Sequence, residues 1–155
     1  MKKKILITLL TFFLSNCGFK VINYSDLVKY NITEIKLLGD KSINHKIKSK
    51  LTYRTSVPQE RKINLAIETT KNKSIKEKNS KNEITKYNVS ITSTVKVMDS
   101  MQENIFNLRI TKIGDYSVGE RHANTLENEK NVLKDITNQI ADDIFRQISL
   151  KLNDL

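Results

Sequence analysis

One residue near the N-terminus has a setting that predicts a specific covalent modification. Cys17 is the only cysteine, and it follows Leu14-Ser15-Asn16, a small-residue window of the kind that lipoprotein processing cleaves. Three lysines precede an apolar run at Ile5–Leu14, which as a helix is about 15 Å long and too short for a hydrocarbon core of about 30 Å. The sequence therefore predicts a lipoprotein signal peptide at residues 1–16 and a diacylglyceryl group on the Cys17 thiol. An ordinary signal peptide that happens to end near a cysteine is the alternative.

Lipidation of Cys17 would anchor the mature chain to a membrane. Two or three acyl chains give stable anchoring, at about 0.8 kcal/mol per buried methylene. Because the only thiol carries the lipid, the mature chain forms no disulfide, and its stability comes from core burial. Gly18, rather than aspartate, follows the cysteine, which favours the outer membrane with the chain facing the periplasm. Residues 17–29 are expected to be a lipidated tether.

Residues that could carry catalysis are few and scattered. His45 and His122 lack a partner at metal-ligand spacing, and no HExxH, nucleophile-elbow or phosphate-binding glycine motif occurs. Asp142 and Asp143 are adjacent on a predicted helix and so point in different directions, which favours a solvated helix face over an acid–base pair. We therefore expect no enzymatic activity, no metal and no cofactor.

The charge balance indicates anionic partners. The formal net charge is +10, and removal of the three leader lysines leaves +7. Such a charge suits nucleic acid, a membrane surface or a phosphorylated glycolipid, and nucleic acid is not expected on the periplasmic side. The alternative is genome bias, since the chain is rich in Lys, Asn and Ile and poor in Arg, Gly, Pro and Ala.

The strongest candidate for a ligand-binding segment is Lys71–Lys86, KNKSIKEKNSKNEITK. It contains six lysines against Glu77 and Glu83, and it connects two predicted strands. If the strands extend into it, the segment is a long hairpin with its turn near Asn79–Asn82. A protruding basic hairpin would bind phosphates at a lipid surface. A solvated flexible loop is the alternative.

Apolar residues alternate with polar ones in four places, which predicts four strands. These are Tyr30–Leu38, the stretch around Ile63, Leu65 and Ile67, the stretch from Tyr87 to Val97, and the stretch around Phe106, Leu108 and Ile110. One apolar face and one polar face are typical of an antiparallel sheet that is covered on one side only.

Two helices are predicted to provide that cover. Asp40 caps a short helix across residues 41–53, which has apolar residues on one face at Ile43, Ile47 and Leu51, and Pro58 marks its exit. Asn124-Thr125-Leu126-Glu127 resembles a capping box at the start of a long helix. Apolar residues recur at helical spacing in that helix: Leu133, Ile136, Ile140, Ala141, Ile144, Ile148 and Leu152.

These elements predict one α+β domain over residues 30–155. It is a two-layer sandwich in the order β-α-β-β-β-α, with two helices packed on one face of a four-stranded, mostly antiparallel sheet. No internal repeat and no boundary inside this domain is evident in the sequence.

Cys17-Gly18-Phe19, followed by a tether, resembles the start of the mature LPS-assembly lipoprotein LptE (also called RlpB). The resemblance continues through the element order, through the lysine-rich hairpin whose second strand opens with Tyr87, and through the terminal helix ENEKNVLKDITNQIADDIFRQISLKL. It covers essentially the whole mature chain.

The resemblance implies a function in the outer membrane. LptE proteins are the lipoprotein component of the lipopolysaccharide translocon, in which they plug the LptD β-barrel, assist its assembly and bind lipopolysaccharide. By position, Lys78 and Lys81 match the family's basic hairpin tip. Arg109 and Lys112, on the last predicted strand, are expected to belong to the same surface.

Three other functions remain open, because small sandwiches host many functions. One is a periplasm-facing lipoprotein binding module for another envelope component, which would not co-purify with a large β-barrel. Another is binding to anionic lipid without a protein partner, in which case affinity would fall steeply with salt. The last is an enzyme of unknown type, which would show clustered, buried ionisable groups.

Overall fold

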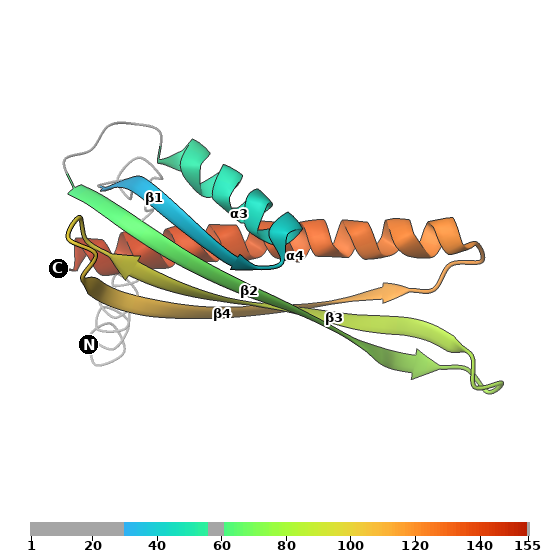
Figure 1. Ribbon diagram of the computed structural model, residues 1–155. Coiled ribbons are helices and arrows are strands. Elements are labelled where there is room, and N and C mark those ends of the chain that lie inside the picture. Colours follow the sequence, from blue (N-terminus) through green and yellow to red (C-terminus); the bar gives the residue numbers. More distant parts are fainter. Residues whose placement is uncertain (1–29, 56–60, 155) are drawn as a thin grey trace, which may run out of the picture.

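The computed structural model describes residues 30–55 and 61–154. Along these ranges the elements are β1 (Tyr30–Gly39), α3 (Lys41–Arg54), β2 (Arg61–Lys78), β3 (Ile84–Met98), β4 (Asn104–Ser117) and α4 (His122–Asn153) (Figure 1). This is the order that the sequence predicts. The predicted signal peptide, the Cys17 tether and Pro58 lie outside the described residues.

The strands form one four-stranded sheet in the order β1-β2-β3-β4. β1 pairs with β2 in parallel, whereas β2 with β3 and β3 with β4 are antiparallel. The connections explain this pattern, because tight turns join antiparallel neighbours while parallel neighbours need a crossover. Here α3 lies in the connection from β1 to β2. The predicted α+β fold with a mostly antiparallel sheet is confirmed.

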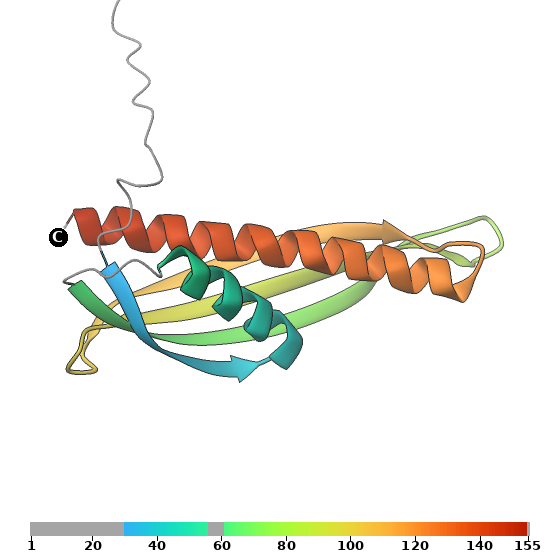
Figure 2. The same cartoon turned by 90° about the horizontal axis from the view of Figure 1, so that it is seen from above.

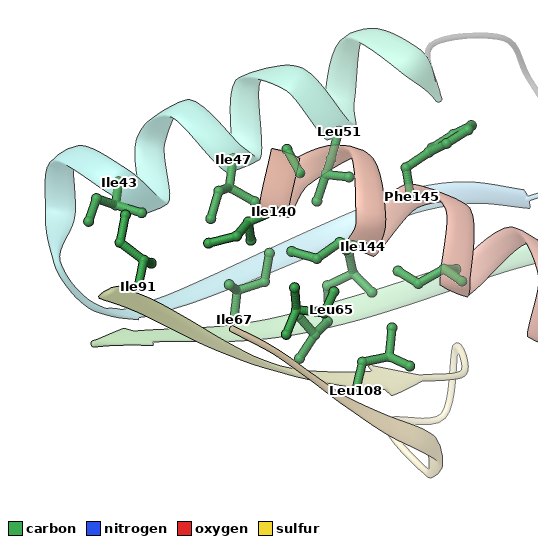
Figure 3. Packing of buried hydrophobic residues seen from close by; sticks show 14 of the residues in the cluster. Ile43, Ile47, Leu51, Leu65, Ile67, Ile91, Leu108, Ile140, Ile144 and Phe145 are labelled. Carbon is green, nitrogen blue, oxygen red and sulfur yellow. The ribbon is translucent and has the colours of Figure 1, made fainter. Parts of the chain in front are cut away.

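Both helices cover the same face of the sheet, and α3 begins where the sequence predicts (Figures 1 and 2). The side chain of Asp40 accepts a hydrogen bond from the backbone N–H of Ile43 at 3.0 Å. Ile43, Ile47 and Leu51 are buried and point toward the sheet and α4 (Figure 3). Four-residue spacing therefore aligned the apolar side of α3 with the core.

α4 is 32 residues long, about 48 Å at 1.5 Å per residue, and lies along the sheet. Its buried residues begin only at Ile136. The helix starts at His122 with no side-chain hydrogen bond at its N-cap, so the predicted capping box at residues 124–127 is wrong. The backbone N–H groups of Asn124 and Thr125 already bond to an earlier carbonyl, and the Thr125 hydroxyl instead accepts a hydrogen bond from the N–H of Gly119 at 3.0 Å.

The start of β1 and the turn between β2 and β3 lie at opposite ends of an elongated molecule (Figure 1). Tyr30 is buried beside the C-terminal part of α4, with its ring centroid 6.3 Å from that of Phe145. Its hydroxyl also contacts Ser149 on the same helix, at 3.4 Å. Whatever precedes Tyr30 therefore joins the domain at the end remote from the lysine-rich turn.

Candidate functional site

The lysine-rich segment is the predicted hairpin, with β2 running to Lys78 and β3 beginning at Ile84. Asn79 organises the turn, because its side-chain oxygen accepts hydrogen bonds from the backbone N–H groups of Lys81 and Glu83, at 3.0 and 2.9 Å. Asn82 has a φ of 63°, which asparagine adopts more readily than most residues. The segment is thus built from paired strands rather than a loop, and its residues 71–83 are all exposed to solvent.

Most of the positive charge of this hairpin is neutralised by ion pairs. The pairs are Lys71 with Asp40 (3.8 Å), Lys73 with Glu129 (2.8 Å), Lys76 with Asp115, and Lys86 with Glu77 (3.0 Å). Lys78 and Lys81 differ, because neither has a carboxylate partner among the described residues. The Lys78 ammonium instead donates to the Asn82 side-chain oxygen at 2.9 Å. The unpaired charge of the hairpin is therefore concentrated at its turn, where the sequence placed its candidate ligand-binding lysines.

Arg109 and Lys112 do not share a surface, so that prediction is wrong. The two residues are three apart on β4, and successive side chains of a strand point to opposite faces. Lys112 lies on the covered face, and its Nζ is 2.6 Å from a carboxylate oxygen of Asp143 on α4. Arg109 lies on the open face opposite Thr94, about 33 Å along β3 from the hairpin turn. Neither residue is therefore part of the hairpin tip.

At the base of the hairpin, Lys73, Tyr87, Tyr116 and Glu129 form a cluster that we call the Lys73 cluster. The Lys73 Nζ lies 4.3 and 5.1 Å from the ring centroids of Tyr87 and Tyr116, whose rings stack at 5.5 Å. One carboxylate oxygen of Glu129 accepts hydrogen bonds from both the Lys73 ammonium and the Tyr116 hydroxyl, at 2.8 and 2.7 Å. The cluster thereby joins β2, β3 and β4 to the N-terminal part of α4.

The ionisation of these groups follows from their contacts. The hydrogen bond from Lys73 lowers the pKa of Glu129, and the same bond raises the pKa of Lys73. Burial raises the pKa of Tyr116. Beside the cluster is a hollow of about 300 Å³, whose other lining residues are Ile84, Val118, Gly119, His122, Thr125 and Leu126. Sequence reasoning missed the cluster, because its members come from four elements that only the fold brings together.

The face of the sheet that the helices leave open is polar over most of its length. Its side chains on β2, β3 and β4 include Glu68, Thr70, Asn72, Ser74, Asn88, Ser90, Thr92, Thr94, Lys96, Arg109, Thr111 and Asp115. The hydroxyls of Thr92 and Thr111 form a hydrogen bond across the strands at 2.9 Å. Leu38 and Ile113 are apolar exceptions, 62% and 64% exposed. The open face is thus a broad surface of hydrogen-bonding groups.

The two histidines lie on different elements, His45 in α3 and His122 at the first position of α4. Within residues 30–55 and 61–154, no three His, Cys, Asp or Glu side chains gather as a set of metal ligands. Neither of the two helices in these ranges is apolar enough to cross a membrane.

Asp142 and Asp143 point in different directions, as the sequence indicates, but both are engaged in ion pairs. The partners are Lys50 and Arg54 for Asp142, at 2.9 and 2.6 Å, and Lys112 and Arg146 for Asp143, at 2.6 and 2.8 Å. The hydrogen bond from Lys112 lowers the pKa of Asp143. The pair is therefore more than a solvated helix face, because the 41% exposed Asp142 connects α4 to α3 and the 18% exposed Asp143 connects it to β4.

The chain resembles known proteins in its fold rather than in its sequence. No protein-family model matches the sequence, and no curated protein is similar to it in sequence. The crystal structure of rare lipoprotein B from Shewanella oneidensis aligns with 77% of this chain and 97% of its own, with a TM-score of 0.59 and 15% identity. The chain has the fold of rare lipoprotein B.

Two further structures support this assignment. Lipoprotein B from Nitrosomonas europaea aligns with 88% of this chain and 93% of its own, with a TM-score of 0.61 and 15% identity. A minor lipoprotein from Acinetobacter baumannii aligns with 79% and 92%, with a TM-score of 0.58 and 20% identity. The resemblance to the LptE (RlpB) family is therefore confirmed at the level of the rare lipoprotein B fold.

Proposed function

We propose that this chain is the outer-membrane lipoprotein component of the lipopolysaccharide translocon. Anchored by a lipid on Cys17 and facing the periplasm, it plugs an LptD-type β-barrel, assists the assembly of that barrel and binds lipopolysaccharide through Lys78 and Lys81. It acts by binding and not by catalysis. The observation that carries the proposal is the polar open face of the sheet on a rare lipoprotein B fold.

The open face supports a position inside a barrel. The interior of a transmembrane β-barrel is polar, whereas its exterior presents an apolar band to lipid. A sheet face of Thr, Ser, Asn and charged side chains matches that interior, because each group can exchange hydrogen bonds with luminal side chains or water. Placing the same face against hydrocarbon would be unfavourable, because each polar group without a hydrogen-bond partner there costs several kcal/mol of free energy.

The length of the hairpin supports a role across the membrane. β2 has 18 residues, which is about 60 Å at 3.3 Å per residue. The hydrocarbon core is about 30 Å thick. Since Tyr30 is at the end remote from the hairpin turn, a chain anchored through residues before Tyr30 can hold its lysine tip well away from the anchor (Figure 1).

The charges at the turn support binding to phosphate. Lys78 and Lys81 are exposed and have no carboxylate partner among the described residues, so their ammonium groups are available to an anionic ligand. The phosphates of lipid A offer such charges, and lysines could there replace the divalent cations that bridge them. A lysine ammonium binds phosphate as a point charge, whereas an arginine guanidinium can form two parallel hydrogen bonds to it. The contact proposed here is therefore mainly electrostatic, and its strength depends on salt.

A second function, binding of anionic lipid without a protein partner, is favoured by the high net charge. Recognition of a membrane surface typically uses clusters of four to eight unpaired basic residues. In this hairpin, four of the six lysines are paired with acidic side chains, which leaves Lys78 and Lys81. The ion pairs therefore argue for a local contact with phosphate rather than broad adhesion to a charged membrane.

Affinity purification of the lipidated protein from detergent-solubilised outer membranes, followed by mass spectrometry, tests the proposal. We expect a near-stoichiometric β-barrel protein of LptD type, retained at high salt because a large plug interface is not mainly electrostatic. Absence of a barrel, under conditions that keep the protein folded, would overturn the proposal. It would leave a lipid-anchored binding module for another envelope component.

A pair of matched variants tests whether the open face is the contact. Thr92→Arg places a long cation on that face, and the control Gln139→Arg places one at an exposed position of α4 that is not on the open face. We expect Thr92→Arg to reduce recovery of the barrel and the control to leave it unchanged, with thermal unfolding confirming that both variants fold. Equal recovery with Thr92→Arg and Gln139→Arg would contradict a role for the open face.

A further inference from the structure

The two helices enclose a groove on the side of the molecule opposite the open face. α3 and α4 run side by side in the same direction over the sheet (Figures 1 and 2). The groove between them has a volume of about 570 Å³ and is lined by His45, Lys46, Ser49, Lys50, Tyr53, Lys134 and Asn138. These residues include three lysines and no carboxylate.

A bound carboxylate marks one end of this groove. Asp142, on α4, lies between Lys50 and Arg54 of α3, with contacts of 2.9 and 2.6 Å. The Lys50 ammonium also donates to the backbone carbonyl of Asn138, at 3.3 Å. Here an acidic side chain from one helix is held by two basic side chains from the other.

One helical turn earlier, the acidic partner is missing. Lys46 precedes Lys50 by four residues on α3, and Asn138 precedes Asp142 by four on α4, so each pair lies on one side of its helix. Lys134 lies one turn before Asn138, and both Lys46 and Lys134 line the groove, from facing helices. Neither lysine has a carboxylate partner among the described residues. Like charges across a groove repel each other, and an anion placed between them would remove that repulsion.

We propose that this groove docks an acidic segment, rich in Asp or Glu, of the β-barrel partner, and that a carboxylate of this segment binds between Lys46 and Lys134. The identity of the partner rests on the proposed function. Asp142 shows which anion this groove accommodates, since a carboxylate occupies the adjacent turn between cations from α3. The groove extends along both helices, so it fits a stretch of chain better than a single small ion.

Tyr53 gives the docking surface an aromatic rim. It lines the groove and is 83% exposed. Tyrosine is among the residues that most often dominate binding energy at protein interfaces, because it combines a large apolar ring with a hydroxyl. On a chain packed into a barrel, a face with Tyr53 beside Lys46 and Lys134 would contact protein rather than water.

Site-specific photo-cross-linking in the full lipidated chain tests this proposal. Tyr53 is replaced by p-benzoyl-L-phenylalanine, the chain is purified with its barrel partner after irradiation, and the cross-linked peptide is identified by mass spectrometry. The same experiment is repeated with Lys46→Glu/Lys134→Glu. Lys41→Glu/Lys48→Glu is the matched control, because these lysines are exposed on α3 and do not line the groove.

We expect a cross-link to a barrel segment that contains several Asp or Glu residues. Its yield should fall about tenfold in Lys46→Glu/Lys134→Glu, because like charges at a contact oppose binding, and should not change in the control. The proposal would be overturned by a cross-link to lipopolysaccharide or by a cross-link to a segment without acidic residues. Equal cross-link yields in all three chains would also overturn it. If the barrel co-purifies but position 53 gives no cross-link, the docking proposal fails and the proposed function stands. If no barrel co-purifies, both fail.

Discussion

At the end of the sheet where β1 begins, aliphatic side chains from the strands and both helices pack into one core (Figure 3). At the hairpin end, by contrast, the side chains are joined by ion pairs, by stacked tyrosine rings and by a shared carboxylate. We call residues 70–88 and 113–133 the distal arm and the remaining described residues the core half. In the distal arm, all of which the structure describes, Tyr116 is the single buried side chain. The distal arm is held instead by the Lys73 cluster and by ion pairs.

The core half and the distal arm contribute differently to the stability of the domain. Burial of aliphatic side chains contributes about 1.5–3 kcal/mol per residue and is insensitive to charge screening and to titration, so the core half sets the stability of the fold. Partly exposed ion pairs contribute about 1 kcal/mol or less, and they respond to salt and pH. The distal arm is thus free to present charge at the hairpin turn without having to hold the domain together.

The largest effect on stability is expected from a cavity in the core half. Ile144 on α4 is fully buried, and Ile144→Ala should lower the free energy of unfolding by about 3 kcal/mol, through lost burial and the cavity left behind. Ile75→Ala is the matched change in the distal arm, where Ile75 is 51% exposed, and should cost less than about 0.5 kcal/mol. Urea unfolding measures both. Similar losses for the two variants would contradict the division into a core half and a distal arm.

The next effect concerns alkaline pH and the buried end of β1. Burial raises the pKa of Tyr30 to about 12, from 10.0 in the unfolded chain. The unfolded chain therefore releases this proton first, and stability falls as pH rises from 10 to 12, by about 2 kcal/mol. Tyr30→Phe should remove that part of the alkaline loss, whereas Tyr53→Phe, at an exposed position, should not. Unfolding followed from pH 8 to pH 12 makes the comparison, and identical profiles for the wild type and Tyr30→Phe would exclude the mechanism.

A smaller effect is expected in the distal arm from Glu129→Gln, which removes the charge that Lys73 and Tyr116 bind. It should lower the free energy of unfolding by about 1 kcal/mol. It should also make amide hydrogen exchange faster in residues 113–118, while exchange in the core stays slow. Glu127→Gln, at an exposed position on the same helix, should change neither quantity.

The pH dependence of the Glu129 contribution has a defined sign. Because the pKa of Glu129 is lowered in the folded state, its stabilisation is present above pH 4.5 and is lost as pH falls through the lowered pKa. The wild type and Glu129→Gln should therefore become equally stable in acid. A difference that persists there would point to packing rather than charge.

The core half was largely predictable from the sequence because its signals are local. Alternation identified β3, since one of its faces is covered and the other is open. Asp40 and the spacing of Ile43, Ile47 and Leu51 located α3 and its buried side. Alternation also implies that Arg109 and Lys112 lie on opposite faces, so the error in grouping them came from treating charge without strand geometry.

The distal arm was less predictable because its contacts join distant parts of the chain. Lys73 and Glu129 are 56 residues apart, and no local pattern indicates that they meet. The six lysines of the hairpin gave no sign that four are paired. The capping pattern at residues 124–127 failed for the opposite reason, since a plausible local motif was overridden by a helix whose N-cap is Arg121, three residues earlier.

The smallest effect on stability, and the sharpest test of the distal arm as a binding element, is Lys78→Glu/Lys81→Glu. Both lysines are exposed at the turn, so the free energy of unfolding should change by less than about 0.5 kcal/mol. Capture of purified lipopolysaccharide should weaken about tenfold at low salt, because two charges at the proposed phosphate contact are reversed from positive to negative. Lys41→Glu/Lys48→Glu makes the same change in net charge on α3 and should leave capture unchanged. Equal weakening by both variants would mean that lipopolysaccharide responds to overall charge, and unchanged capture by the hairpin variant would remove Lys78 and Lys81 from the binding site.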